Sequence, residues 1–304
     1  MLNSTDSGNL KRIEEFYLSS SLTERKAYIT ISAINIPLSI TAFLGNALII
    51  AVLPKASFLH SPSKLLLGCL ASTDLSVGLV AQPLYVNYLL TSNLSKHYYN
   101  SLLLFNSTCT IFCGVSLMTL TAISMDRLLA VLLGLRYRQV ITLRRVWIFV
   151  VTLWLLSIAN GVILHYIPLY VVRIASVEVI LCIIVSACCY MKIYRILGHH
   201  QAQVQQHVHQ RQPNGGEIPL NIARYRRIVS SMMWVQISLV ACYLPFGAVA
   251  GLLAISDRPL PQFTIDAALT LIMFNSTLNP FLYCWKMQEM KQVVKNTLLR
   301  KTGN

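Results

Sequence analysis

Residues 146–172 read VWIFVVTLWLLSIANGVILHYIPLYVV, and no charged side chain lies between Arg145 and Arg173. A helix needs about 20 consecutive apolar residues to cross the hydrocarbon core of a bilayer, which is roughly 30 Å thick. Only helices and closed barrels satisfy their backbone hydrogen bonds in lipid, and this stretch lacks the alternation of barrel strands. This stretch therefore predicts a membrane-spanning helix.

The same pattern recurs along the chain, where long segments between basic residues hold either no charge or a single acid. The predicted spans cover residues 28–53, 63–90, 98–131, 144–166, 168–197, 222–255 and 261–284. The predicted fold is all-α: a seven-transmembrane helix bundle with a short amphipathic helix after the last span.

The remaining segments divide the chain into a tail, a membrane domain and an end piece. We predict an extracellular N-terminal tail over residues 1–27 and a seven-transmembrane domain over residues 28–284. Residues 198–220 are polar and rich in His and Gln, so we expect a flexible cytoplasmic loop there. In residues 285–304 the apolar side chains share one helical face, which predicts an amphipathic helix on the inner leaflet and a cytoplasmic tail.

Composition and charge agree with a membrane protein. The chain is 55% hydrophobic and 12% charged, whereas globular domains average roughly 25% charged residues. With the N-terminus outside, most of the 25 Lys and Arg residues fall in cytoplasmic segments, as the positive-inside rule requires. The net charge of +14 then indicates attraction to membrane lipid and no nucleic-acid partner. We expect a multi-pass plasma-membrane glycoprotein with an extracellular N-terminus, with acceptor sequons beginning at Asn3 and Asn93.

The eight cysteines all lie in or beside spans, so we predict no extracellular disulfide. Their spacing does not match a metal site, and no cofactor is expected. A solvated loop is the favoured interpretation of the histidines at 199, 200, 207 and 209, although they could also hold a metal ion.

A charged group inside a membrane is costly and is a functional candidate by default. Asp74 lies in the middle of the second predicted span. A carboxylate surrounded by amide and hydroxyl oxygens can bind a small hard cation or hold a proton, and a purely structural polar cluster is the alternative. The candidate partners at similar depth are Asn46, Ser116, Asn275, Ser276 and Asn279.

At this point the motifs become specific, because they occur in order and at the right depth in all seven spans. They are Gly45-Asn46, Leu70-Ala71 with Asp74, Asp126-Arg127-Leu128, Trp154, Tyr190, Cys242-Tyr243-Leu244-Pro245 and Asn279-Pro280-Phe281-Leu282-Tyr283. In these motifs the chain resembles the rhodopsin-like (class A) G-protein-coupled receptors. Within that class its pattern is similar to the melanocortin, adenosine and cannabinoid group.

The resemblance implies roles for the matching positions. Asp74, Ser116, Asn275, Ser276 and Asn279 match the allosteric sodium pocket of the family. Asp126, Arg127, Leu135, Tyr190, Tyr243, Pro245, Asn279, Pro280 and Tyr283 match positions of the conformational switch and of G-protein coupling. The implied mechanism is a bundle with two states, in which an agonist works by preferring one of them.

Several positions depart from the pattern of the family. Tyr243 replaces the usual tryptophan, Leu102 stands where most members have a cysteine, and Cys182 stands where the fifth span often has proline. Tyr225 occupies the place of an acid that pairs with Arg127 in many members. We therefore hypothesise high basal signalling.

The outer half of the bundle is expected to form the ligand pocket. By position we expect it to contain Tyr85, Tyr88, Cys109, Thr110, Cys113, Ile174, Glu178, Phe246, Ala250, Leu269 and Met273. Cys109 and Met273 replace the aspartate of amine receptors and the retinal lysine of opsins, and Ala250 replaces an asparagine of adenosine receptors. Glu178 is interpreted as a counter-ion for a cationic ligand or, alternatively, as a buried protonated carboxyl group.

The sequence thus predicts a plasma-membrane receptor that binds an extracellular ligand and activates a heterotrimeric G protein. The alternative is an ion- or proton-coupled transporter that uses Asp74 and Glu178. A membrane enzyme ranks last, because we find no paired catalytic acids, metal cluster or nucleophile–base set on a shared face.

Overall fold

The computed structural model describes residues 4–57, 59–91, 96–210, 218–255, 260–286 and 288–302. The side chains it describes are those of residues 25–57, 59–91, 99–168, 170–199, 234, 236–253, 255, 260–285 and 290–297. All the statements below concern these parts of the chain.

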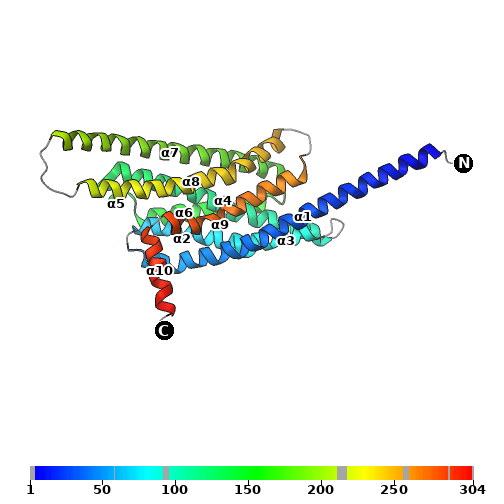
Figure 1. The fold of residues 1–304 in the computed structure, drawn as a ribbon, viewed down its shortest axis with the longest axis horizontal. Helices are drawn as coiled ribbons and strands as arrows, with labels where there is room; N and C mark the ends of the chain where they lie inside the picture. The colour runs from blue at the N-terminus through cyan, green and yellow to red at the C-terminus, as the bar shows by residue number, and fades with distance from the viewer. Residues whose placement is uncertain are drawn as a thin grey trace.

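The described chain is helical throughout, which confirms the all-α prediction. The helices are α1 (Ser4–Val52), α2 (Ser61–Ser76), α3 (Gln82–Leu90), α4 (Lys96–Leu133), α5 (Tyr137–Val140), α6 (Leu143–Ile163), α7 (Pro168–Gln210), α8 (Ile218–Ile255), α9 (Gln262–Lys286) and α10 (Gln288–Thr302). Short 3₁₀ turns, Leu53–Lys55 and Gly134–Arg136, follow α1 and α4. The long helices lie side by side as one bundle, whereas α10 runs across their axes (Figure 1).

Six helical segments among the described residues are long and apolar enough to cross a membrane. They lie in α1, in α2 with α3, in α4 with α5, and in α6, α7 and α8. The seventh span is α9, which packs against α1 and α8. Its hydropathy is lower because it carries Asp266, Asn275 and Asn279, and these polar side chains are buried inside the bundle.

The second span contains a π-helical segment, Val77–Ala81, between α2 and α3. Pro83 is the second residue of α3, and a proline inside a helix removes one backbone donor and crowds the preceding turn. A π-bulge accommodates such a break, because its hydrogen bonds reach one residue further, as from the Gln82 amide to the Val77 carbonyl. Gly78 in this segment approaches the backbone of α1, and the Ser39 hydroxyl donates to its carbonyl at 2.6 Å.

Two helices extend beyond the predicted bounds of their spans. α1 begins at Ser4, so the predicted tail continues the first span as helix, and α7 runs to Gln210 where we expected a loop from residue 198. Once an apolar segment has formed a helix, adding residues is cheap compared with nucleation. The Gln, Ala, Leu, Lys and Glu residues of these flanks are good helix formers, so both helices extend.

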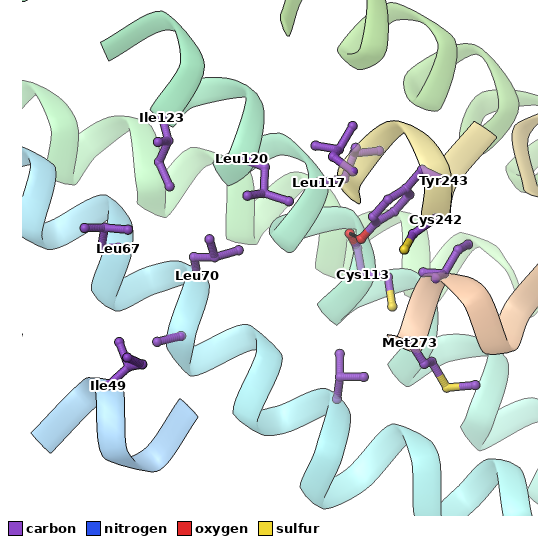
Figure 2. Packing of buried hydrophobic residues seen from close by; sticks show 14 of the residues in the cluster. Ile49, Leu67, Leu70, Cys113, Leu117, Leu120, Ile123, Cys242, Tyr243 and Met273 are labelled. Carbon is purple, nitrogen blue, oxygen red and sulfur yellow. Dashed lines mark hydrogen bonds between the residues drawn. The ribbon is translucent and has the colours of Figure 1, made fainter. Parts of the chain in front are cut away.

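Burial separates the inside of the bundle from its membrane face. Leu70, Leu117, Tyr243 and Met273 belong to one buried cluster drawn from several spans (Figure 2). Many leucine and isoleucine side chains on the outer faces, by contrast, are exposed. Such a surface suits lipid, since large exposed apolar areas on a helix bundle mark a membrane or a protein interface.

Candidate functional site

Asp74 lies at the centre of a polar cluster in the middle of the bundle, where it is fully buried. Its Oδ1 accepts hydrogen bonds from the Ser116 and Ser276 hydroxyls at 3.0 and 2.8 Å. Its Oδ2 accepts one from Asn279 Nδ2 at 2.7 Å. The structure therefore brings together side chains from α2, α4 and α9 that lie up to 205 positions apart in the chain.

Several oxygens around this cluster have no hydrogen-bond partner. The side-chain oxygens of Asn46, Asn275 and Asn279 are buried and unpartnered, and Asn275 Nδ2 is unpartnered as well. Asn46 Nδ2 donates to the Ala42 and Ser276 carbonyls, which ties α1 to α9. Carboxylate, hydroxyl and amide oxygens are the ligands that hard cations prefer, so the donor set fits a sodium ion.

The inner end of the bundle holds Arg127 beside Asp126. Arg127 Nη2 lies 3.3 Å from Asp126 Oδ2, and Asp126 also accepts hydrogen bonds from Ser63 Oγ at 2.9 Å and from the Tyr137 hydroxyl. His60 stacks edge-on against Tyr137, with ring centroids 5.6 Å apart. Asp126 is thus held by three groups, and Arg127 borders a polar cavity of about 430 Å³ beside the start of α2.

The other predicted switch residues lie along α7, α8 and α9. Tyr190 and Tyr283 are buried, and the Tyr283 hydroxyl has no hydrogen-bond partner. Pro245 and Pro280 are inside α8 and α9, as a hinge role requires. The Tyr243 hydroxyl donates to the Cys113 carbonyl at 3.3 Å, so the residue that replaces the usual tryptophan links α8 to α4 (Figure 2).

Leu135 is at the tip of the turn that follows α4, and 97% of its surface is exposed. Tyr225 falls outside the residues whose side chains the structure describes, so the hypothesis about basal signalling stays a prediction.

A cavity of about 260 Å³ lies in the outer half of the bundle between α4, α6, α7, α8 and α9. Most of the predicted pocket residues line it, namely Cys109, Thr110, Cys113, Ile174, Glu178, Phe246, Ala250 and Leu269. The lining is largely apolar, as is usual for small-molecule sites. Glu178 Oε1 is buried in this lining and has no hydrogen-bond partner.

Three predicted pocket residues are not among the side chains that line this cavity, and their role in ligand binding stays a prediction. Tyr85 and Tyr88 stack with Phe105, with ring centroids 4.6 and 6.3 Å from it, and are not among the lining side chains. Met273 is fully buried in the apolar cluster. Tertiary packing turns these side chains toward neighbouring helices, which helical position alone did not reveal.

The cavity has further lining residues that the sequence did not predict, and two of them are polar side chains on the fourth span. Ser157 and Asn160 on α6 face the cavity, and Gly161 allows α6 to approach α4, since a Cβ there would lie 2.6 Å from Ile111. The polar residues Ser157 and Asn160 within an apolar span were the available signal.

All eight cysteines are described and free, which agrees with the expected lack of a disulfide. Cys109 and Cys113 are in contact, with their Sγ atoms 3.8 Å apart. Among the described residues no cluster of three or more His, Cys, Asp or Glu side chains could hold a metal ion. His199 is exposed, and the side chains of the other three loop histidines lie outside the described residues.

Together, the apolar bundle, the buried polar centre and the outer cavity define a helical membrane protein with a ligand-sized site. Residues 45–169 and 165–283 match the family described as 7 transmembrane receptor (rhodopsin family). The chain belongs to this family.

Curated relatives of similar length agree. The chain is 26% identical to adenosine receptor A3 of Ovis aries over 291 residues, which cover 87% of this chain and 88% of the relative. It is 25% identical to adenosine receptor A3 of Bos taurus over 298 residues, which cover 88% of each. The resemblance drawn from the motifs is confirmed. The protein is a multi-pass plasma-membrane G-protein-coupled receptor for an extracellular ligand and not an enzyme, and nothing in these matches supports the transporter alternative.

Proposed function

We propose that the outer cavity is the ligand site of this receptor and that its ligand is a small molecule with an apolar body and one cationic group. The main support is Glu178, a partly buried acid that lines the cavity and whose Oε1 is buried without a hydrogen-bond partner. A buried carboxylate is stabilised by an opposite charge, and the apolar walls exclude water that would screen the pair. The cavity volume of about 260 Å³ suits a small ligand.

A nucleoside is the second candidate, because the relatives are named adenosine receptors. Asn106, Thr110 and Asn160 provide hydrogen-bonding groups at the same cavity, as a ribose or a base would need. Ala250 on the cavity wall argues against adenosine itself, because the resemblance places an asparagine at this position in adenosine receptors.

The test is a ligand screen in cells, read out by G-protein activation, that contains nucleosides and small amines. For a cationic agonist, Glu178→Gln is expected to lower potency by about 30-fold or more, because removing one partner of a buried charge pair costs 2–5 kcal/mol. Ser176→Ala is the matched control, since Ser176 lies on the same helix and donates to the Arg173 carbonyl. Equal potencies of wild type and Glu178→Gln would remove the cationic proposal, and activation by adenosine alone would favour the nucleoside.

We further propose that the Asp74 cluster binds a sodium ion. The residues that would hold it are Asp74, Ser116, Asn275, Ser276 and Asn279. Support comes from the oxygen-rich donor set and the unpartnered amide oxygens. When bound, the ion would neutralise Asp74 and hold α2, α4 and α9 in one arrangement.

G-protein docking is assigned to the inner surface formed by Arg127, the polar cavity beside it and Leu135. The N-terminus is assigned to the extracellular side, since the basic excess then lies inside. An epitope tag at the N-terminus should be stained on intact cells, whereas staining only after permeabilisation would reverse this orientation.

A further inference from the structure

A second buried acid, Asp266, belongs neither to the Asp74 cluster nor to the lining of the outer cavity. It lies in α9 one turn after the helix begins at Gln262, and it is fully buried. The Tyr85 hydroxyl donates to its Oδ1 at 3.1 Å, and Gln262 Nε2 does so at 3.3 Å. Its Oδ2 has no hydrogen-bond partner, and no Lys or Arg of the described residues forms an ion pair with it.

The neighbouring helix α1 presents further unpartnered oxygens. Asn35 Nδ2 donates to the Thr270 hydroxyl at 3.2 Å, and that hydroxyl donates to the Asp266 carbonyl at 2.8 Å. Asn35 Oδ1 and the Ser32 hydroxyl are buried without a partner. Hydrogen bonds therefore connect α1 to the turn of α9 that carries Asp266.

Helix geometry places these oxygens at similar depth. α1 and α9 run side by side in the same direction (Figure 1). Ser32 lies about one turn outward from Asn35, and Asp266 lies about one turn outward from Thr270, so Ser32 and Asp266 are roughly level. Gln82 on α3 is one turn inward from Tyr85, and both its side-chain polar atoms are buried and unpartnered.

Burying such a cluster costs free energy unless a proton or a ligand compensates its charge and its unpartnered polar groups. A buried charge without an opposite charge costs several kcal/mol, and each buried unpartnered polar group adds about 1–3 kcal/mol. A proton would neutralise Asp266 alone, whereas a small cation would satisfy Asp266 Oδ2, Asn35 Oδ1 and the Ser32 hydroxyl together. These groups are all oxygens, which favour a hard metal ion.

We propose that Asp266, Asn35 and Ser32 form a second site for a sodium ion, at the outer ends of the first, second and seventh spans. Tyr85, Thr270 and Gln82 complete its surroundings. The site is separate from the Asp74 cluster, because Asp266 and Ser276 are about 15 Å apart along α9. Its ion would join α1 to α9 and enter from the extracellular side, where Gln262 is exposed.

The experiment counts sodium ions bound per purified receptor, with radioactive sodium at saturation and choline replacing sodium at constant ionic strength. Asp266→Asn is expected to bind one ion fewer than wild type. Ser176→Ala is the control, because it removes a hydroxyl that is bonded within α7 in the outer half of the bundle, and it should bind as many ions as wild type. An unchanged count in Asp266→Asn would overturn the proposal.

Ser32→Ala leaves the charge of Asp266 in place, and it is the second test variant in case Asp266→Asn does not fold. It should raise the half-saturating sodium concentration of this site about tenfold or more, since even groups that only orient a metal ligand cost that much on removal. Thr41→Val, which removes a hydroxyl bonded within α1, is its control. Equal sodium affinities of Ser32→Ala and wild type would also overturn the proposal. Asp74→Asn tests the central site separately, because each variant removes its own ion.

Discussion

Asp126 makes more contacts than its pairing with Arg127. Its carboxylate accepts from Ser63 and Tyr137 as well as pairing with Arg127, and it is buried while Arg127 is partly exposed. Because the two hydroxyls stabilise the charged carboxylate, they also stabilise the position of Asp126 against which Arg127 rests. The restraint that the resemblance assigns to Asp126 would thus extend to α2 and to the short helix α5.

Tyr137→Phe tests this restraint. The change deletes one hydrogen bond to a charged group, worth about 1.5–3 kcal/mol, and leaves the ring packing against His60. Basal nucleotide exchange on the G protein should rise about tenfold if the bond is lost on activation. Tyr166→Phe is the control, because Tyr166 is exposed at the outer end of the fourth span. Equal basal exchange in both variants would show that Tyr137 does not restrain the switch.

At the scale of elements, the second span depends on its π-helical segment. The extra residue accommodates Pro83 and shifts the outer part, α3, relative to α2. Tyr85 thereby reaches Asp266 on α9, while Asp74 on α2 faces the central cluster. The second span thus contributes Asp74 to the central cluster and Tyr85 to the surroundings of Asp266.

Gly78→Ala should disturb this element. A Cβ at Gly78 would lie 2.8 Å from the Phe43 nitrogen and from the Ser39 carbonyl oxygen, and backbone atoms cannot move aside cheaply. We expect a loss of about 1–3 kcal/mol of stability, measured as a lower melting temperature in detergent. Gly251→Ala should be neutral or slightly stabilising, because nothing lies within 4 Å and alanine favours helix. Similar melting temperatures for the two variants would contradict the close packing.

The connection after the third span leaves Leu135 exposed, at the same end of the bundle as Arg127. An exposed leucine beside the switch is a candidate anchor for a partner, and truncation of an interface anchor costs more than about 1 kcal/mol. Leu135→Ala should reduce agonist-driven nucleotide exchange about tenfold without changing ligand binding. Val140→Ala, also partly exposed, should not, and equal losses in both variants would argue against a specific contact.

At the scale of the whole molecule, Tyr225 bears on how strongly the resting state of the receptor is favoured over the active state. The resemblance places Tyr225 where many members have an acid that pairs with Arg127, so this chain lacks one restraint between the third and sixth spans. Exchange without agonist should therefore exceed that of a null receptor. Tyr225→Glu should lower the rate of agonist-free exchange, whereas Tyr225→Gln should not. An agonist-free rate of the wild-type receptor equal to that of the null receptor would refute the hypothesis.

The sequence by itself determined the spans, their order and the family, because hydropathy and motifs are local properties. The sequence also assigned Asp74, Ser116, Ser276 and Asn279 to one cluster, because the resemblance implies that these positions lie at a similar depth in the bundle. The seventh span was recognised because the stretch between Arg258 and Lys286 holds a single charged residue, although its buried polar residues lower its hydropathy.

Only the tertiary structure decided which face each helix buries. It placed Tyr85, Tyr88 and Met273 outside the lining of the outer cavity and Ser157 and Asn160 within that lining. It also joined Asp266 to α1 and Tyr137 to Asp126. These contacts depend on helix rotation, tilt and the π-helical shift, and such quantities are set by packing between segments distant in the chain.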